Sequence, residues 1–410
     1  MTKPFLHSVT SVLTGALIAQ LIPIFGTLAL ARFFAPSSFG IFSVWLGGVL
    51  FLAVILSGRF EASLATERDG SPRRLAVAMT LLTIFLATPV ALTILLLVVS
   101  FGLLDHLNFP ILLIILIVPA ASLVAATQTL QNWASADGRY AQLSYMRIIQ
   151  SSFSTITQII FGVLSFDVIG LAFGYFLGAL VGLIFAWYLE PIKRFDFGAP
   201  WLNLHRFWHE KKRFPMLSLP ADSINVAAAQ LPVLLVAARF GADSAGLLAM
   251  ALRMLGAPMS LLSASVLDVF KRHAGQAYLD RSECRSEFLH AFLILASISL
   301  VAGISLAVGI KPFFVFAFGD AWLGAGAMAL WLLPRFIIGF VASPMSYMTY
   351  IAGKQHLDLM WQLALLAMTF FTLSFASSIQ ITLVSYGFGY SALYLVYLVM
   401  SYRFSLGKIS

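Results

Sequence analysis

The sequence predicts an all-α integral membrane protein of twelve transmembrane helices, in two six-helix lobes that are related by an internal repeat. Three observations support this fold class. Apolar residues occupy 60% of the 410 positions and charged residues only 10%, whereas a typical soluble chain is about 25% charged. Twelve apolar stretches are long enough to cross a bilayer, which takes roughly 20 residues in a helix. Short motifs near the start also recur about two hundred residues later.

The apolar stretches are continuous, which indicates helices, because strands of a membrane barrel would alternate in segments of about ten residues. Several contain glycine or proline, which membrane helices tolerate. The first stretch follows Lys3 as a secretory signal would, but it is long enough to span and has a counterpart at mid-chain, so we expect it to be retained. The spans are expected at 8–30, 39–60, 75–101, 110–133, 141–165, 168–189, 215–237, 245–268, 288–310, 327–350, 357–377 and 379–402.

Two landmarks recur in the same order in both halves. Residues 31–40 and 238–246 both begin with Ala-Arg-Phe and continue through Ala and Ser to Gly. A proline also stands nineteen residues before a pair of glycine and a basic residue, once at Pro119 and again at Pro334. Many transporters place their substrate site between two such duplicated bundles.

The basic residues predict the orientation in the membrane. The even-numbered connections and the two termini together hold twenty Lys and Arg residues, while the opposite connections hold only Arg32, Arg239 and Lys311. Because basic loops stay in the cytoplasm, we expect both termini there. The net charge of +8 is therefore a topology signal, and we do not expect nucleic-acid binding.

The longest polar stretch separates an N-terminal lobe, 1–190, from a C-terminal lobe, 215–410, with a cytoplasmic linker at 191–214. Trp201, Leu204 and Trp208 recur at i, i+3 and i+7 within the linker, which would place them on one face of a helix. This pattern is typical of a helix at the membrane interface; an ordinary charged linker fits equally well.

The connections on the outer side are all short, which disfavours a membrane-embedded glycan polymerase with catalytic groups in a large loop. The sequence contains no phosphate-binding loop motif, so we expect that ATP is not the direct energy source. We expect neither an enzyme nor a cofactor. The connection from Lys271 to Glu287 is expected to be solvated. Its Cys284, the single cysteine, is expected to have no role.

Ionisable side chains at membrane depth are costly, so each is a functional candidate. Arg253 and Arg335 lie within expected spans and must face the bundle interior or a watery cavity. A guanidinium offers a planar fork of donors that matches phosphate, so these two arginines suggest an anionic substrate. The alternative, that Asp222 or Asp268 neutralises one of them in a structural pair, stays open.

Other polar residues complete the candidate site. Arg59 and Glu61 close the second span, and Asp222 near the start of the seventh has Gln230 among its polar neighbours. Asp222, Glu61 and Asp268 are candidates for coupling to Na+ or H+. Arg59, Gln230 and the amides of the fourth and fifth spans, Gln128, Gln131, Asn132, Gln150 and Gln158, are candidates to line a central cavity; the alternative for the amides is a role in helix-to-helix contacts.

The order of short motifs resembles that of bacterial polysaccharide flippases of the Wzx type, over almost the whole chain. The first half carries Ala31-Arg32-Phe33-Phe34-Ala35-Pro36-Ser37-Ser38-Phe39-Gly40 and then Gly58-Arg59-Phe60-Glu61-Ala62. The second half carries Phe214-Pro215, Ser218-Leu219-Pro220, Gln230-Leu231-Pro232, Arg253-Met254-Leu255, Phe318-Gly319-Asp320-Ala321-Trp322 and Ser343-Pro344. Asp268 departs from the family, where a neutral polar residue is expected, and Ser38 stands where an acidic one is frequent.

The resemblance implies membership of the multidrug/oligosaccharidyl-lipid/polysaccharide exporter superfamily, with two six-helix lobes around a cationic cavity. It further implies that the substrate is an undecaprenyl-pyrophosphate-linked oligosaccharide, such as an O-antigen unit for lipopolysaccharide, which alternating access moves to the outer leaflet. Membrane lipid and polysaccharide polymerase or assembly proteins are the expected partners. The alternative is a cation-coupled multidrug exporter of the same superfamily, which would favour carboxylates over arginines in its cavity.

Overall fold

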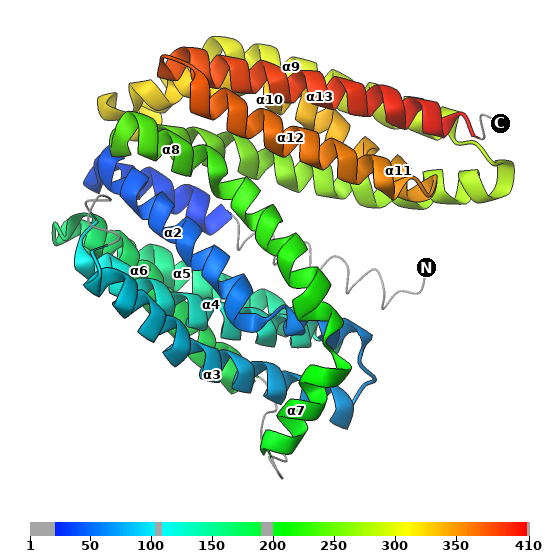
Figure 1. The fold of residues 1–410 in the computed structure, drawn as a ribbon. Coiled ribbons are helices and arrows are strands. Elements are labelled where there is room, and N and C mark those ends of the chain that lie inside the picture. Colours follow the sequence, from blue (N-terminus) through cyan, green and yellow to red (C-terminus); the bar gives the residue numbers. More distant parts are fainter. Residues whose placement is uncertain (1–20, 103–108, 190–199, 408–410) are drawn as a thin grey trace. The chain divides into compact units, whose positions relative to one another are not determined.

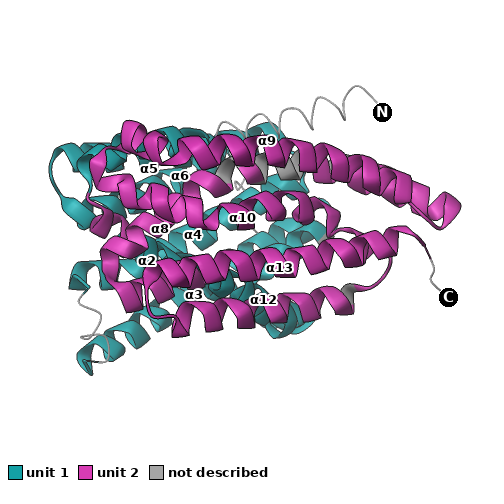
Figure 2. Ribbon diagram, turned by 90° about the horizontal axis from the view of Figure 1, so that it is seen from above, with its two compact units in different colours: residues 1–34, 41–230 teal, residues 35–40, 231–410 magenta. Residues whose placement is uncertain are grey.

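The computed structural model describes residues 21–102, 109–189 and 200–407, apart from some side chains, most of them between 257 and 269. The described residues are almost entirely helical (Figure 1). The chain divides into two compact units, of which unit 1 comprises residues 1–34 and 41–230 and unit 2 comprises residues 35–40 and 231–410 (Figure 2).

The helices of the first half begin with Leu21–Phe33. They continue with α2 (Pro36–Ser57), the 3₁₀ helix η1 (Phe60–Thr66), α3 (Ser71–Ser100), α4 (Ile111–Ala136), α5 (Tyr140–Val163), α6 (Asp167–Leu189) and α7 (Pro200–Glu210). Within unit 1, α4 packs against α3, α5 and α6.

The helices of the second half follow a short π-helical turn, η3 (Phe214–Ser218). They are α8 (Leu219–Arg281), α9 (Arg285–Phe318), the 3₁₀ turn η4 (Asp320–Trp322), α10 (Leu323–Met345), α11 (Met348–Ile351), α12 (Gln355–Phe375) and α13 (Ile379–Ser405). Within unit 2, α10 lies between α9 and α13, and α12 packs on α13.

The predicted helical membrane fold is confirmed, since each expected span falls on a helix wherever the chain is described. Nine described helices are long and apolar enough to cross a membrane. The count differs from twelve because the first span is described only over Leu21–Phe33, α5 is not among the nine, and α8 contains two expected spans. The backbone of α8 is interrupted at Gly241, whose φ of 83° is one that glycine adopts without strain.

Two expectations about connections are wrong. The connection expected at Lys271–Glu287 is shortened to residues 282–284, because α8 continues to Arg281 and α9 begins at Arg285. Cys284, between these helices, is fully buried, with its Sγ 3.5 Å from Sδ of Met348. The second span ends at Ser57, so that Arg59 and Glu61 lie beyond it, at the start of η1.

The linker helix α7 is docked on unit 1. Phe207 is buried in a cluster with Phe60 and Leu64. Trp208 lies 5.2 Å from the Phe60 ring, and its indole N–H donates to Oγ1 of Thr83 over 3.0 Å. A helix is therefore present around Trp208, and Phe207 and part of the half-exposed Trp208 contact protein. Its predicted place at the membrane interface stays a prediction. The side chain of Trp201 lies outside the described residues.

The two copies of the repeated motif meet at their glycines inside unit 2. A Cβ atom on Gly40 would overlap the carbonyl oxygen of Ala242, and a Cβ on Gly246 would overlap that of Pro36. The contact is reciprocal, because Gly40 and Gly246 hold the same place in their motifs. Small residues allow such close backbone approach in membrane helices, so the glycine that ends each copy of the motif allows α2 and α8 to cross in close contact.

Candidate functional site

Arg335 lies in the middle of α10, and aromatic rings surround its guanidinium. The guanidinium carbon is 4.2 Å from the ring centre of Tyr390, 5.0 Å from that of Tyr386 and 5.3 Å from that of Phe336. Each distance is within the range of a cation–π interaction. The rings stabilise the charge at membrane depth, and no described carboxylate forms an ion pair with it.

The tyrosines form a row along α13. Tyr386, Tyr390 and Tyr394 are spaced four residues apart, which places them on one side of the helix. Adjacent ring centres are 5.8 Å and 4.8 Å apart. Trp361 of α12 extends the row, 4.9 Å from Tyr394 and 4.7 Å from Tyr397.

The row ends at a carboxylate on α12. The hydroxyl of Tyr397 donates to Oδ1 of Asp358 over 2.5 Å, and the amide of Gln362 donates to Oδ2 over 2.8 Å. A continuous set of aromatic contacts thus joins Asp358, in the first turn of α12, to Arg335.

A cavity of about 430 Å³ lies beside this row in unit 2. Arg335, Ser343, Tyr390 and Tyr394 contribute its polar groups, and no Asp or Glu is among its described lining residues. The Nη1 atom of Arg335 is buried and has no hydrogen-bond acceptor among the described residues. Buried donors are nearly always paired, so this guanidinium has capacity for an anionic ligand.

Arg253 does not line this cavity, although α8 contributes Gly256, three residues later. Its side chain is partly buried. The side chain of Asp268 lies outside the described residues, so the alternative that Asp268 pairs with an arginine stays a prediction.

A second charged cluster lies in unit 1, where the loop after α2 meets the first turn of α8. Arg59 Nε donates to Oδ2 of Asp222 over 2.6 Å, and Nη1 donates to Oε1 of Glu61 over 2.8 Å. Glu61 is only 2% exposed, and its Oε2 has no hydrogen-bond partner among the described residues. One cation therefore bridges two carboxylates, and Asp222 pairs with Arg59.

The backbone at this cluster is strained. Arg59 has a φ of 58°, in the left-handed region, directly after Gly58 with a φ of 57°. A residue other than glycine adopts this conformation at a cost, commonly at functional sites. The conformation places Arg59 between Glu61 of η1 and Asp222 of α8.

The predicted amides have separate surroundings. Gln131 donates to Gln150 over 3.1 Å, and the buried Gln158 donates to the carbonyl of Leu171 over 2.9 Å, so these amides join helices. Gln230 packs beside Gly47, and Gln128 is exposed. Among the described residues, no cluster of three His, Cys, Asp or Glu side chains is arranged to hold a metal ion.

The sequence reasoning missed the tyrosines around Arg335. Their signal was present, since tyrosines four residues apart in an expected span form a polar-edged stripe. Nothing in the sequence, however, indicates that this stripe faces α10 about fifty residues earlier.

Comparisons with known proteins agree with this architecture. The model of a family described as polysaccharide biosynthesis protein matches residues 29–327. No curated protein matches the sequence.

Several solved structures share the fold at low sequence identity. A lipid II flippase, MurJ, in an inward closed conformation has a TM-score of 0.68 at 14% identity, over 95% of this chain and 87% of that one. A multidrug resistance MATE family transporter in an outward-facing conformation has a TM-score of 0.64 at 15% identity, over 97% and 94%. A superfamily transporter from Pyrococcus furiosus, described as having a binding pocket of reverse polarity, has a TM-score of 0.60 at 14% identity, over 97% and 95%.

Proposed function

Because the chain belongs to the polysaccharide biosynthesis protein family, we propose that it is a flippase for lipid-linked glycans. Its fold is that of membrane transporters of the multidrug/oligosaccharidyl-lipid/polysaccharide exporter superfamily. Its substrate is an undecaprenyl-pyrophosphate-linked oligosaccharide, such as an O-antigen repeat unit. Movement of the N-terminal lobe, 1–190, against the C-terminal lobe, 215–410, opens the substrate site alternately to the two faces of the cytoplasmic membrane.

The observation that carries this proposal is the aromatic-walled cation at Arg335. A pyrophosphate needs permanent positive charge and N–H donors, which a guanidinium supplies. The rings of Tyr390 and Tyr394 supply flat faces beside it for a sugar. The absence of Asp and Glu from the described lining disfavours the rival substrate class, cationic drugs, because cations would be repelled by Arg335.

Substitution of Arg335 tests the proposal. Arg335→Gln removes the charge and should abolish export of surface polysaccharide in a cell that depends on this protein, with the protein still present in the membrane. Arg335→Lys keeps the charge but loses the planar fork and should restore export only in part. Arg403→Gln, at an exposed arginine of α13, is the matched control. Full export by Arg335→Gln contradicts the role, and drug efflux that is insensitive to Arg335→Gln favours the drug exporter.

We further propose that the Arg59 cluster couples transport to Na+ or H+. Arg59 bridges the carboxylates of Glu61 and Asp222. A cation that binds one of them neutralises its charge, which would release Arg59 from that carboxylate toward the other. The Asp222→Asn variant should lose the dependence of glycan translocation in proteoliposomes on an imposed Na+ or pH gradient. If the variant responds to both gradients as the unaltered protein does, the cluster has only a structural role.

The distribution of basic residues supports an inner-membrane location with both termini in the cytoplasm. Reporter domains that are active on only one side of the membrane, fused at the C-terminus, test this orientation. Polysaccharide polymerase or assembly proteins are the proposed partners, because they would receive the exported glycan.

A further inference from the structure

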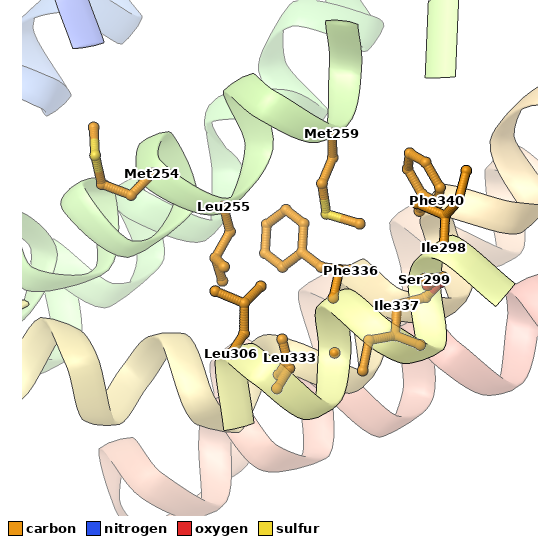
Figure 3. A pocket seen from close by; sticks show the side chains of 12 residues that line it. Met254, Leu255, Met259, Ile298, Ser299, Leu306, Leu333, Phe336, Ile337 and Phe340 are labelled. Carbon is orange, nitrogen blue, oxygen red and sulfur yellow. The ribbon is translucent and has the colours of Figure 1, made fainter. Parts of the chain in front are cut away.

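A second cavity in unit 2, of about 210 Å³, is almost purely apolar (Figure 3). Residues of α8, α9 and α10 line it, among them Leu255, Ile298 and Leu333. Its hydroxyl group belongs to Ser299, which donates to the carbonyl of Ile337 over 2.7 Å. That hydroxyl is already satisfied, so the cavity offers a ligand only carbon and sulfur surface.

The apolar cavity shares a wall with the cavity of Arg335. Met259, Phe336 and Phe340 line both, and Figure 3 shows these three side chains between α8 and α10. Phe336 also touches the guanidinium of Arg335. The cavity of Arg335 and the apolar cavity therefore adjoin each other at the same three side chains.

The apolar cavity is accessible along α9. Ile298 is 46% exposed and Leu306 is 36% exposed, although both line the cavity. Both belong to a helix that is apolar enough to span the membrane. A hydrocarbon chain can therefore reach the cavity past the α9 surface without crossing polar protein.

An empty apolar void is unfavourable because its lining lacks dispersion contacts on one side. Water does not relieve this cost, because a water molecule needs polar partners that this lining lacks. A hydrocarbon chain restores the missing contacts. The occupant that fits both cavities is an amphiphile, with its anionic head at Arg335 and an apolar chain attached to that head.

We propose that the cavity between α8, α9 and α10 is a binding site for the isoprenoid units next to the pyrophosphate of the substrate. The inference rests on the proposed function, since it assigns the lipid end of the same ligand. It adds a determinant of lipid recognition that is independent of the glycan. The protein would distinguish a polyprenyl-linked pyrophosphate from a free one by filling this cavity.

Affinity as a function of chain length tests the site. The probes are inorganic pyrophosphate, isopentenyl diphosphate and farnesyl diphosphate, titrated against the purified full-length protein in one detergent. Burial of two methylene-sized groups is worth about tenfold in affinity, so farnesyl diphosphate should bind at least about tenfold more tightly than pyrophosphate. The same detergent throughout keeps partition of the probe into micelles equal among variants.

Two variants fill the cavity, and a third variant is their control. Ile298→Trp and Ala302→Trp place an indole at lining positions and should remove the gain from chain length while leaving the pyrophosphate affinity unchanged. Ala307→Trp makes the same change at an exposed position of α9 outside the lining and should keep the gain. Two cavity variants, with unchanged pyrophosphate affinity as a criterion of folding, guard against a misfolded protein.

The outcomes separate the two proposals. A chain-length gain that is absent from the unaltered protein, persists in both cavity variants or is also lost in Ala307→Trp overturns the isoprenoid site. Pyrophosphate that fails to bind, or binds equally to Arg335→Gln, overturns the proposed function and this inference with it.

Discussion

Arg73 should be the most important single charge for the stability of unit 1. It lies in the first turn of α3, is 5% exposed, and donates to the carbonyls of Leu64, Glu67 and Ala136 over 3.0, 2.7 and 3.1 Å. It also pairs with Asp137 over 2.6 Å. One guanidinium thereby joins η1, the start of α3 and the end of α4.

The magnitude follows from these contacts. A hydrogen bond to a charged group contributes about 1.5–3 kcal/mol, and a buried acceptor left unpaired adds a desolvation cost. These contributions are not additive, so we expect Arg73→Ala to lower the free energy of unfolding by about 3–5 kcal/mol, in the range for breaking a buried ion pair. At about 2–4 °C per kcal/mol for a unit of 150–250 residues, Tm should fall by at least about 6 °C.

The adjacent Arg74 is the matched control. It is exposed and donates only to the carbonyl of Gly70, at 3.4 Å, so Arg74→Ala should shift Tm by less than about 2 °C. Both variants are heated in detergent, and the fraction that remains monodisperse is measured by size-exclusion chromatography. Equal shifts in Tm would show that the network around Arg73 contributes no more than a surface charge, and the reasoning would be wrong.

Two further predictions concern the crossing of the repeat and the single cysteine. Gly40→Ala or Gly246→Ala should each destabilise the protein by about 1–3 kcal/mol, because the new methyl group overlaps a backbone carbonyl; Gly48→Ala, whose nearest neighbour would be at 4.0 Å, should not lower Tm, and equal effects would contradict the crossing. Burial raises the pKa of the Cys284 thiol to about 11, so at pH 8 its thiolate, the reactive form, should be about two-hundredfold scarcer than that of a free cysteine. Maleimide should label Glu283→Cys, in a Cys284→Ser background, far faster than native Cys284 until denaturant is added; comparable rates would show that the thiol is accessible.

The spans and the repeat followed from the sequence because both are local properties. A run of about 20 apolar residues has one stable outcome in a bilayer, a helix whose backbone hydrogen bonds are internal. The linker helix around Trp208 was predictable for a similar reason, since its amphipathic spacing lies within about two turns of one helix. The boundaries were less certain: α8 continues to Arg281, although the charged residues after Lys271 indicated a loop.

Partners across the fold could not be derived in this way. Asp222 was one of two proposed neighbours for Arg253 or Arg335, yet it pairs with Arg59, 163 positions earlier. Cys284 has charged sequence neighbours and was expected to be in a solvated connection, but the ends of α8, α9 and α13 bury it, and its N–H donates to the carbonyl of Ser405. Sequence neighbours are therefore a poor guide to the surroundings of a side chain.

The membrane environment, the helical architecture, the duplication and the identity of the charges at membrane depth all follow from the sequence alone. Hydrophobicity and charge are properties of residues and short segments. The partners of those charges depend instead on the tertiary fold. The guanidinium of Arg335 lies among tyrosines of α13, whereas that of Arg59 is neutralised by two carboxylates. Glu61 is a neighbour of Arg59 in sequence, but packing alone brings Asp222 to Arg59 and the tyrosines of α13 to Arg335, because distance in sequence carries no information about distance in space.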